Sequence, residues 1–134
     1  MLRAKNKKRK ILLFDNDKEL ADNIKLYLED LYAVNIVTNI DNLAPELFKQ
    51  SYDFLIFEAT STDIHYNIII NKIRLIVPDT KIVLMCTFFD TDNNTERSIL
   101  GNVDDYIFKP FDVNLLRQKL IKLYSPKKVV SVTG

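Results

Sequence analysis

Five polar side chains, each at the end of an apolar run, have the residue types of a site for a metal ion and a phosphoryl group. They are Asp15, Asn16, Glu58, Thr87 and Lys109. Mg²⁺ prefers the oxygen ligands that carboxylates and amides supply. An ammonium group and a hydroxyl group can hold phosphoryl oxygens. Each residue alone is equally well explained as a helix cap or a loop residue, so the hypothesis depends on a fold that brings them together.

Five short runs rich in branched and aromatic residues predict five strands. They cover residues 10–14, 33–37, 53–57, 81–86 and 105–108. The first, third and fourth runs have almost no polar interruption, which is typical of strands buried on both faces in the centre of a parallel sheet.

Segments with helical spacing separate these strands. Apolar residues predict helices over 20–31 and 113–123, with Asn16 or Asp17 capping the first and Asp112 capping the last.

The remaining helices have weaker patterns. Segment 64–76 has β-branched isoleucines that favour a strand, but its apolar spacing predicts a helix. Segments 41–50 and 91–100 are weaker helices, and we expect Gly101 to lie just past the end of the second.

Alternation of strands and helices predicts a five-stranded parallel α/β sheet, joined by right-handed crossovers and covered by helices on both faces. In such open sheets the site lies beyond the carboxyl ends of the central strands. The five polar residues follow those ends, so we expect them to converge in one pocket.

The charge distribution argues against a nucleic-acid-binding domain. The 134 residues carry a formal charge of +1, but six of the basic residues precede the first apolar run and leave 13 basic against 18 acidic residues in the body. Nucleic-acid-binding domains instead have basic residues along a face of the fold. We interpret the basic start as a solvated leader.

The chain lacks the features of a secreted or membrane protein. Its single cysteine, Cys86, lies in an apolar run and reads as a buried residue in a reducing compartment. The apolar run after the leader is too short for a signal peptide, and no run is long enough to span a bilayer. We therefore expect a cytoplasmic protein.

The segments "ILLFDND", "YDFLIFE", "IVLMCT" and "DDYIFKPF" closely resemble the receiver domain of two-component response regulators, over about residues 9 to 124. The resemblance implies a doubly wound (βα)5, flavodoxin-like fold that acts in phosphorelay signalling. It places Asp15 and Asn16 at the acidic pair that holds Mg²⁺, and Glu58 at the phosphoacceptor position. Thr87 stands at the hydroxyl sensor, Lys109 at the family's lysine and Tyr106 at the aromatic switch.

The sequence departs from the family at two of these positions. Asn16 is a neutral amide where the second acid stands, so we expect only weak Mg²⁺ binding by Asp15, Asn16 and Glu58. Glu58 has one methylene more than Asp, and misplacement of an attacking oxygen on that scale costs on the order of a hundredfold in rate. We therefore expect an atypical receiver that acts without phosphorylation of Glu58.

The longer Glu58 side chain suggests a substitute for the phosphoryl group. We expect its carboxylate to pair with Lys109 and to accept a hydrogen bond from Thr87. The domain would then rest in an active-like state, with Tyr106 turned inward and Phe88 and Phe89 covering the site.

Two alternatives stay open. One is a conventional phosphorylation switch that tolerates Glu58 or uses another acid such as Asp15. The other is a phosphatase of the haloacid-dehalogenase type, because Asp15 and Asp17 form an Asp-x-Asp pattern after the first strand. Glu19 stands where that family has Thr or Val, and no cap domain is inserted, so we expect no enzymatic activity.

The resemblance implies a sensor histidine kinase or another signalling protein as the partner. We expect the face of helix four, strand five and helix five to bind that partner or to form a homodimer, without membrane contact. The charged residues expected to contribute are Arg97, Asp104, Asp105 and Lys119.

The expected organisation is a basic leader (1–8), a receiver domain (9–125) and a C-terminal tail (126–134). Nucleic-acid binding would then belong only to an effector domain outside this chain. Whether the chain is complete or a fragment is left open.

Overall fold

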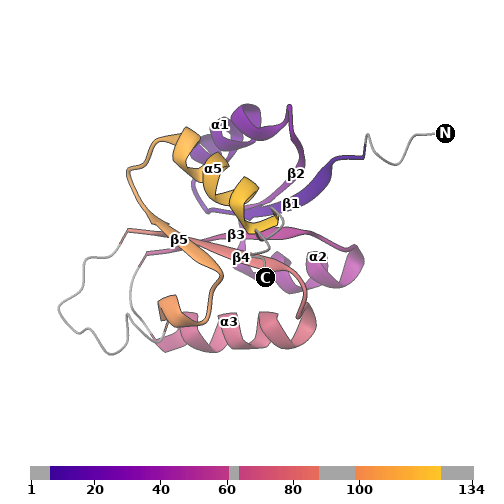
Figure 1. The fold of residues 1–134 in the computed structure, drawn as a ribbon. Helices are drawn as coiled ribbons and strands as arrows, with labels where there is room; N and C mark the ends of the chain where they lie inside the picture. The colour runs from indigo at the N-terminus through magenta and orange to yellow at the C-terminus, as the bar shows by residue number, and fades with distance from the viewer. Residues whose placement is uncertain (1–6, 61–63, 88–98, 125–134) are drawn as a thin grey trace, which may run out of the picture.

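The computed structural model describes residues 7–60, 64–87 and 99–124, while residues 1–6, 61–63, 88–98 and 125–134 lie outside this description. Five parallel strands form one sheet in the order β2-β1-β3-β4-β5, which confirms the predicted fold class (Figure 1). The strands are β1 (Arg9–Phe14), β2 (Tyr32–Val37), β3 (Phe54–Ala59), β4 (Lys81–Cys86) and β5 (Asp105–Phe108).

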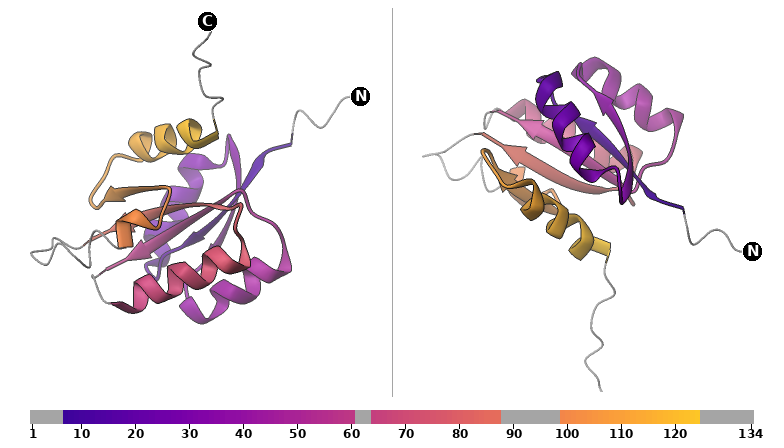
Figure 2. Two further views of the ribbon diagram at one scale, coloured as in Figure 1. Left: turned by 60° about the horizontal axis from the view of Figure 1, so that its bottom comes forward. Right: turned by 90° about the horizontal axis from the view of Figure 1, so that it is seen from above.

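Helices cover both faces of the sheet (Figure 2). On one face, α1 (Lys18–Leu28) and α5 (Val113–Tyr124) pack against the strands. On the other face lie α2 (Leu43–Lys49) and α3 (Ile64–Ile76).

Strand β3 is buried on both faces, which explains why its sequence is apolar without interruption. Phe54 and Ile56 pack toward α1 and α5, whereas Leu55 and Phe57 pack toward α2 and α3. All six of its residues are buried. A carboxylate in this strand therefore needs a partner, because an unpaired buried charge is costly.

The strand predictions hold best for β4 and β5, whose bounds are confirmed at both ends. Strand β3 runs two residues past the predicted end, so Glu58 lies inside the strand and Ala59 ends it.

Polar caps fix the starts of α1 and α5. Asp17 Oδ1 accepts a hydrogen bond from the Leu20 amide at 3.1 Å, which makes Asp17, and not Asn16, the N-cap of α1. Asp112 Oδ1 likewise accepts from the Asn114 amide at 2.9 Å, which confirms the predicted cap of α5.

Helix α3 has the predicted bounds despite its isoleucines. Ile70 and Ile73 are buried against the sheet, so tertiary packing outweighs the strand propensity of β-branched residues.

The weaker helix predictions need correction. The segment predicted over 41–50 is a 3₁₀ turn (Ile40–Asn42) followed by α2. Most of the helix predicted over 91–100 lies outside the described residues. Residues 99–101 are helical, so Gly101 belongs to the helix instead of following it.

The start of β1 and the end of α5 meet at the amino-terminal edge of the sheet. The Arg9 guanidinium carbon lies 3.9 Å from the centroid of the Tyr124 ring, and the Tyr124 hydroxyl donates to the Asp53 carbonyl at 3.2 Å. No described helix is long and apolar enough to cross a membrane.

Candidate functional site

Three ionisable side chains meet at the carboxyl ends of β1, β3 and β5. Lys109 Nζ donates to Asp15 Oδ2 at 2.8 Å and to Glu58 Oε2 at 3.1 Å. Asp15 is 0% and Glu58 6% exposed, and the Lys109 side chain is 14% exposed. The predicted convergence of these residues and the predicted pairing of Glu58 with Lys109 are confirmed.

Backbone hydrogen bonds hold the two residues that follow their strands. The Asp15 amide donates to the Val37 carbonyl at 3.2 Å, and the Lys109 amide donates to the Cys86 carbonyl at 2.7 Å. Both continue the sheet ladder by one residue. The sheet thus fixes the backbone from which Asp15 and Lys109 project toward Glu58.

Lys109 remains charged between its two carboxylate partners. Burial acts to lower the pKa of the Lys109 ammonium, but hydrogen bonds and charges from Asp15 and Glu58 outweigh burial and raise that pKa above its ordinary value. With both carboxylates ionised, the three groups carry a net charge of about −1. We call them the Lys109 triad.

Asn16 contributes to the site through its backbone. Its amide N–H lies 3.3 Å from Glu58 Oε1, whereas the residue as a whole is exposed. Asp15 Oδ1 accepts from the Asp17 amide at 2.9 Å. Every carboxylate oxygen of Asp15 and Glu58 therefore has a protein donor.

These contacts occupy the carboxylate oxygens that a divalent cation would need as ligands. Asn16 offers only a neutral amide, and Asp17 caps α1. Among the described residues, no group of three or more carboxylate, imidazole or thiol side chains is placed to hold a metal ion. The residues present do not fit a tight Mg²⁺ site, and weak binding stays a prediction.

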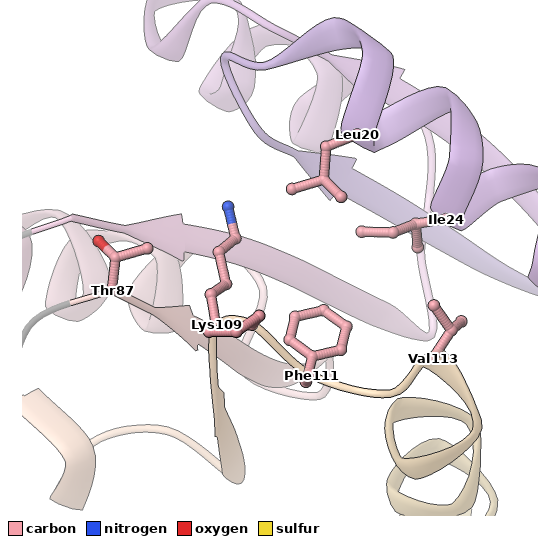
Figure 3. Close-up of a pocket in the computed structure, with 7 residues that line it drawn as sticks. Leu20, Ile24, Thr87, Lys109, Phe111 and Val113 are labelled. Carbon is pink, nitrogen blue, oxygen red and sulfur yellow. The ribbon is translucent and has the colours of Figure 1, made fainter.

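Thr87 lies near the Lys109 triad without joining it. Its amide donates to the Ala59 carbonyl at 3.2 Å. Its hydroxyl lies on the side away from Lys109 (Figure 3), and no hydrogen bond joins it to Glu58 within the described part of the chain. The predicted Thr87–Glu58 contact is therefore wrong for this structure. Phe88 and Phe89 lie outside the described residues.

Tyr106 is turned outward, so the predicted inward rotamer is wrong. The residue is 39% exposed, and its ring packs edge-on against Phe108 with centroids 5.6 Å apart. Strand β5 is an edge strand, and Tyr106 lies between the half-buried Asp105 and the buried Ile107. Pairing of Glu58 with Lys109 thus does not by itself bring Tyr106 inward.

Sequence reasoning missed a cavity of about 460 Å³ next to the Lys109 triad (Figure 3). It is lined by Leu20, Ile24, Thr87, Lys109, Pro110, Phe111 and Val113. The spacing of Leu20, Ile24 and Val113 predicts helices, and spacing carries no signal for a gap between them.

The sequence analysis also did not predict a contact between Thr60, which follows β3, and Tyr66 of α3. The Tyr66 hydroxyl lies 3.1 Å from Thr60 Oγ1 and accepts from the Thr60 amide at 3.4 Å. The Tyr66 ring also packs edge-on against Phe57. The only sequence signal for this contact is an aromatic residue, Tyr66, in the first turn of α3.

Comparisons with known proteins agree with this fold, although no family model matches. The regulatory protein VanRB of Enterococcus faecalis is 24% identical over 112 residues, which are 83% of this chain and 50% of VanRB, so the chain spans half the length of this curated relative. A two-component response regulator from Clostridium difficile has a TM-score of 0.74 at 26% identity, over 87% of this chain and 95% of its own. The response regulator TrrA from Thermotoga maritima, solved in complex with Mg²⁺-BeF, has a TM-score of 0.71 at 24% identity, over 86% and 98%. The fold of this chain is thus that of response-regulator receiver domains, and its relatives and structural neighbours are proteins of that kind.

Proposed function

We propose that this receiver relays a signal through protein–protein contact without phosphorylation of Glu58. The observation that carries the proposal is the buried pairing of Glu58, whose two carboxylate oxygens face Lys109 Nζ at 3.1 Å and the Asn16 amide at 3.3 Å. A built-in negative charge occupies the place where a phosphorylated receiver would gain one.

Two features of the site oppose phosphoryl transfer to Glu58. An attacking oxygen must leave its ammonium partner, and separating an enclosed ion pair leaves an uncompensated charge in the interior. The missing acid at Asn16 also weakens the cation that would neutralise the transferred group.

Incubation with acetyl phosphate and Mg²⁺, followed by intact mass measurement, tests the proposal. We expect no phosphoryl adduct on the parent chain. The double variant Glu58→Asp with Asn16→Asp should gain one, because it supplies a shorter acceptor and a second acid. TrrA, whose structure holds Mg²⁺-BeF, is a suitable positive control.

Other outcomes would replace the proposal. A parent adduct that disappears in Glu58→Gln would establish the conventional phosphorylation switch. Steady release of phosphate without an adduct would indicate a phosphatase.

For partners, we propose a sensor histidine kinase or another cytoplasmic signalling protein, and self-association through β5 and α5. Lys119 Nζ lies 3.1 Å from Asp105 Oδ1, so this charged pair forms within one chain. Asp104 Oδ2 accepts from Arg74 Nη2 and from the Ile82 amide, both at 2.7 Å, so Asp104 also stabilises the fold of the single chain. Arg97 lies outside the described residues.

A further inference from the structure

We propose that the cavity between α1 and the segment after β5 binds a small neutral amphiphile, with its hydrogen-bond acceptor at Lys109 and its apolar body between the helices. The inference rests on the proposed function, in which the pairing of Glu58 with Lys109 persists. It adds a regulatory ligand to a site that takes no phosphoryl group.

The shape and lining of the cavity suit a small molecule. Its volume of about 460 Å³ is in the range of ligand pockets, and one side is open to solvent. Leu20 and Ile24 of α1 face Phe111 and Val113 across it (Figure 3). This apolar lining is a poor host for water, which needs several polar partners.

Polar groups are confined to one end of the cavity. Figure 3 shows the Lys109 ammonium group at that end, with Thr87 beside it. An ammonium group has three N–H donors, and Asp15 and Glu58 accept from two of them. No third acceptor for Lys109 is present among the described residues, so one donor is available to a ligand.

The charge of the Lys109 triad selects the kind of acceptor. Two carboxylates and one ammonium leave a net charge of about −1, so an anionic ligand would be repelled. A cationic headgroup such as an ammonium has no lone pair to accept the N–H, and it would be repelled by the charge of the Lys109 ammonium group next to it. A neutral carbonyl oxygen, as in an amide, accepts the free N–H without either cost.

Three unbranched eight-carbon probes differ in their headgroup: octanamide, octanoate and octylammonium. Each is titrated into the ¹⁵N-labelled full chain below its micelle concentration, and amide shifts are followed by NMR. We expect saturable octanamide binding, with the largest shifts around residues 20–24 and 109–113. Octanoate and octylammonium should bind about tenfold more weakly or worse. No saturable octanamide binding, or equal binding of all three probes, would overturn the proposal.

Variants place the binding in this cavity. Leu20→Trp should fill it and weaken octanamide binding about tenfold or more. Leu26→Trp is the matched control, because Leu26 lies on the same helix but is 70% exposed. If Leu20→Trp fails to fold, Val113→Phe fills the cavity from α5. Unchanged binding in the folded cavity variants, or loss of binding in Leu26→Trp, contradicts the assignment.

Glu58→Gln tests the charge argument. It brings the net charge of the three positions to about zero, so octanoate should gain relative to octanamide. An unchanged ratio would overturn the selectivity argument. A phosphoryl adduct on the parent chain would remove the proposed function and leave octanamide binding intact, whereas absent binding without an adduct would remove only this inference.

Discussion

At the scale of single residues, Lys109 is the only described cation in contact with two buried carboxylates, Asp15 and Glu58. Enclosed ion pairs add little net stability, because desolvation offsets attraction. Removing one partner is different, since it leaves uncompensated charge in the interior.

We predict that Lys109→Met destabilises the folded chain by about 3–5 kcal/mol at neutral pH, which urea denaturation would measure. The control is Lys18→Met, which removes the exposed pair between Lys18 and Asp22 on α1 and should cost at most about 1 kcal/mol. If Lys109→Met unfolds the protein, adding Asp15→Asn should recover stability. Equal effects of the two Lys→Met changes would contradict the burial argument.

Asn16→Asp should tighten Mg²⁺ binding by on the order of tenfold, because it adds an anionic oxygen beside Asp15. Isothermal titration of the parent and the variant measures the difference. Asn23→Asp is the control, since Asn23 is exposed on α1 away from the strand ends. Similar affinities for the parent and Asn16→Asp would show that Lys109, and not the missing acid, limits cation binding.

At the scale of elements, Tyr52 ties β2 to α2. Its buried hydroxyl donates to Glu46 Oε2 at 2.6 Å and accepts from Asn35 Nδ2 at 2.8 Å. Burial, followed by the contact with Glu46, raises the pKa of Tyr52 to about 12, although Asn35 acts to lower it. An unfolded tyrosine loses its proton near pH 10.

The folded chain therefore binds more protons than the unfolded chain between about pH 10 and 12, so Tyr52 contributes stability below this window that is lost as the pH rises through it. We predict that Tyr52→Phe costs about 0.5–1.5 kcal/mol at neutral pH and makes the alkaline loss of stability less steep. Urea denaturation at a series of pH values measures both effects. Tyr106→Phe, at an exposed position, should leave neutral stability almost unchanged. An equally steep alkaline loss in Tyr52→Phe would contradict the assignment.

The sequence predicted most of the elements, and with them the meeting of Asp15, Glu58 and Lys109, because each of these residues ends or follows an apolar run that predicts a strand. It did not predict the outward Tyr106, because the residue pattern of a strand does not determine how far a side chain at the sheet edge is covered. The cavity was equally hidden, because apolar residues such as Leu20 and Phe111 have the same spacing whether their helices touch or stand apart.

At the scale of the whole molecule, β5 and α5 form the surface proposed for self-association. Lys119 and Asp105 pair there within one chain, so this surface carries a positive and a negative charge side by side. Two copies related by a two-fold axis could place such charge pairs opposite each other.

Single reversals at this pair, Asp105→Lys or Lys119→Glu, should weaken self-association measured by analytical ultracentrifugation. The control is Lys18→Glu, at an exposed position of α1 that belongs to neither β5 nor α5. The double reversal restores the pair and should recover association. If the parent is monomeric at all concentrations, or if single reversals change nothing, this surface is not a homodimer interface.

The contact between Arg9 and Tyr124 places the two ends of the folded chain side by side, at the edge of the sheet opposite the Lys109 triad. A circular permutant is therefore geometrically simple: a short linker would join residue 124 to residue 9, and new ends would open at the exposed Asp79, in the turn before β4. Such a rearranged gene should give the same sheet with its site undisturbed. The order of the five strands along the chain can thus change while their order in the sheet stays the same.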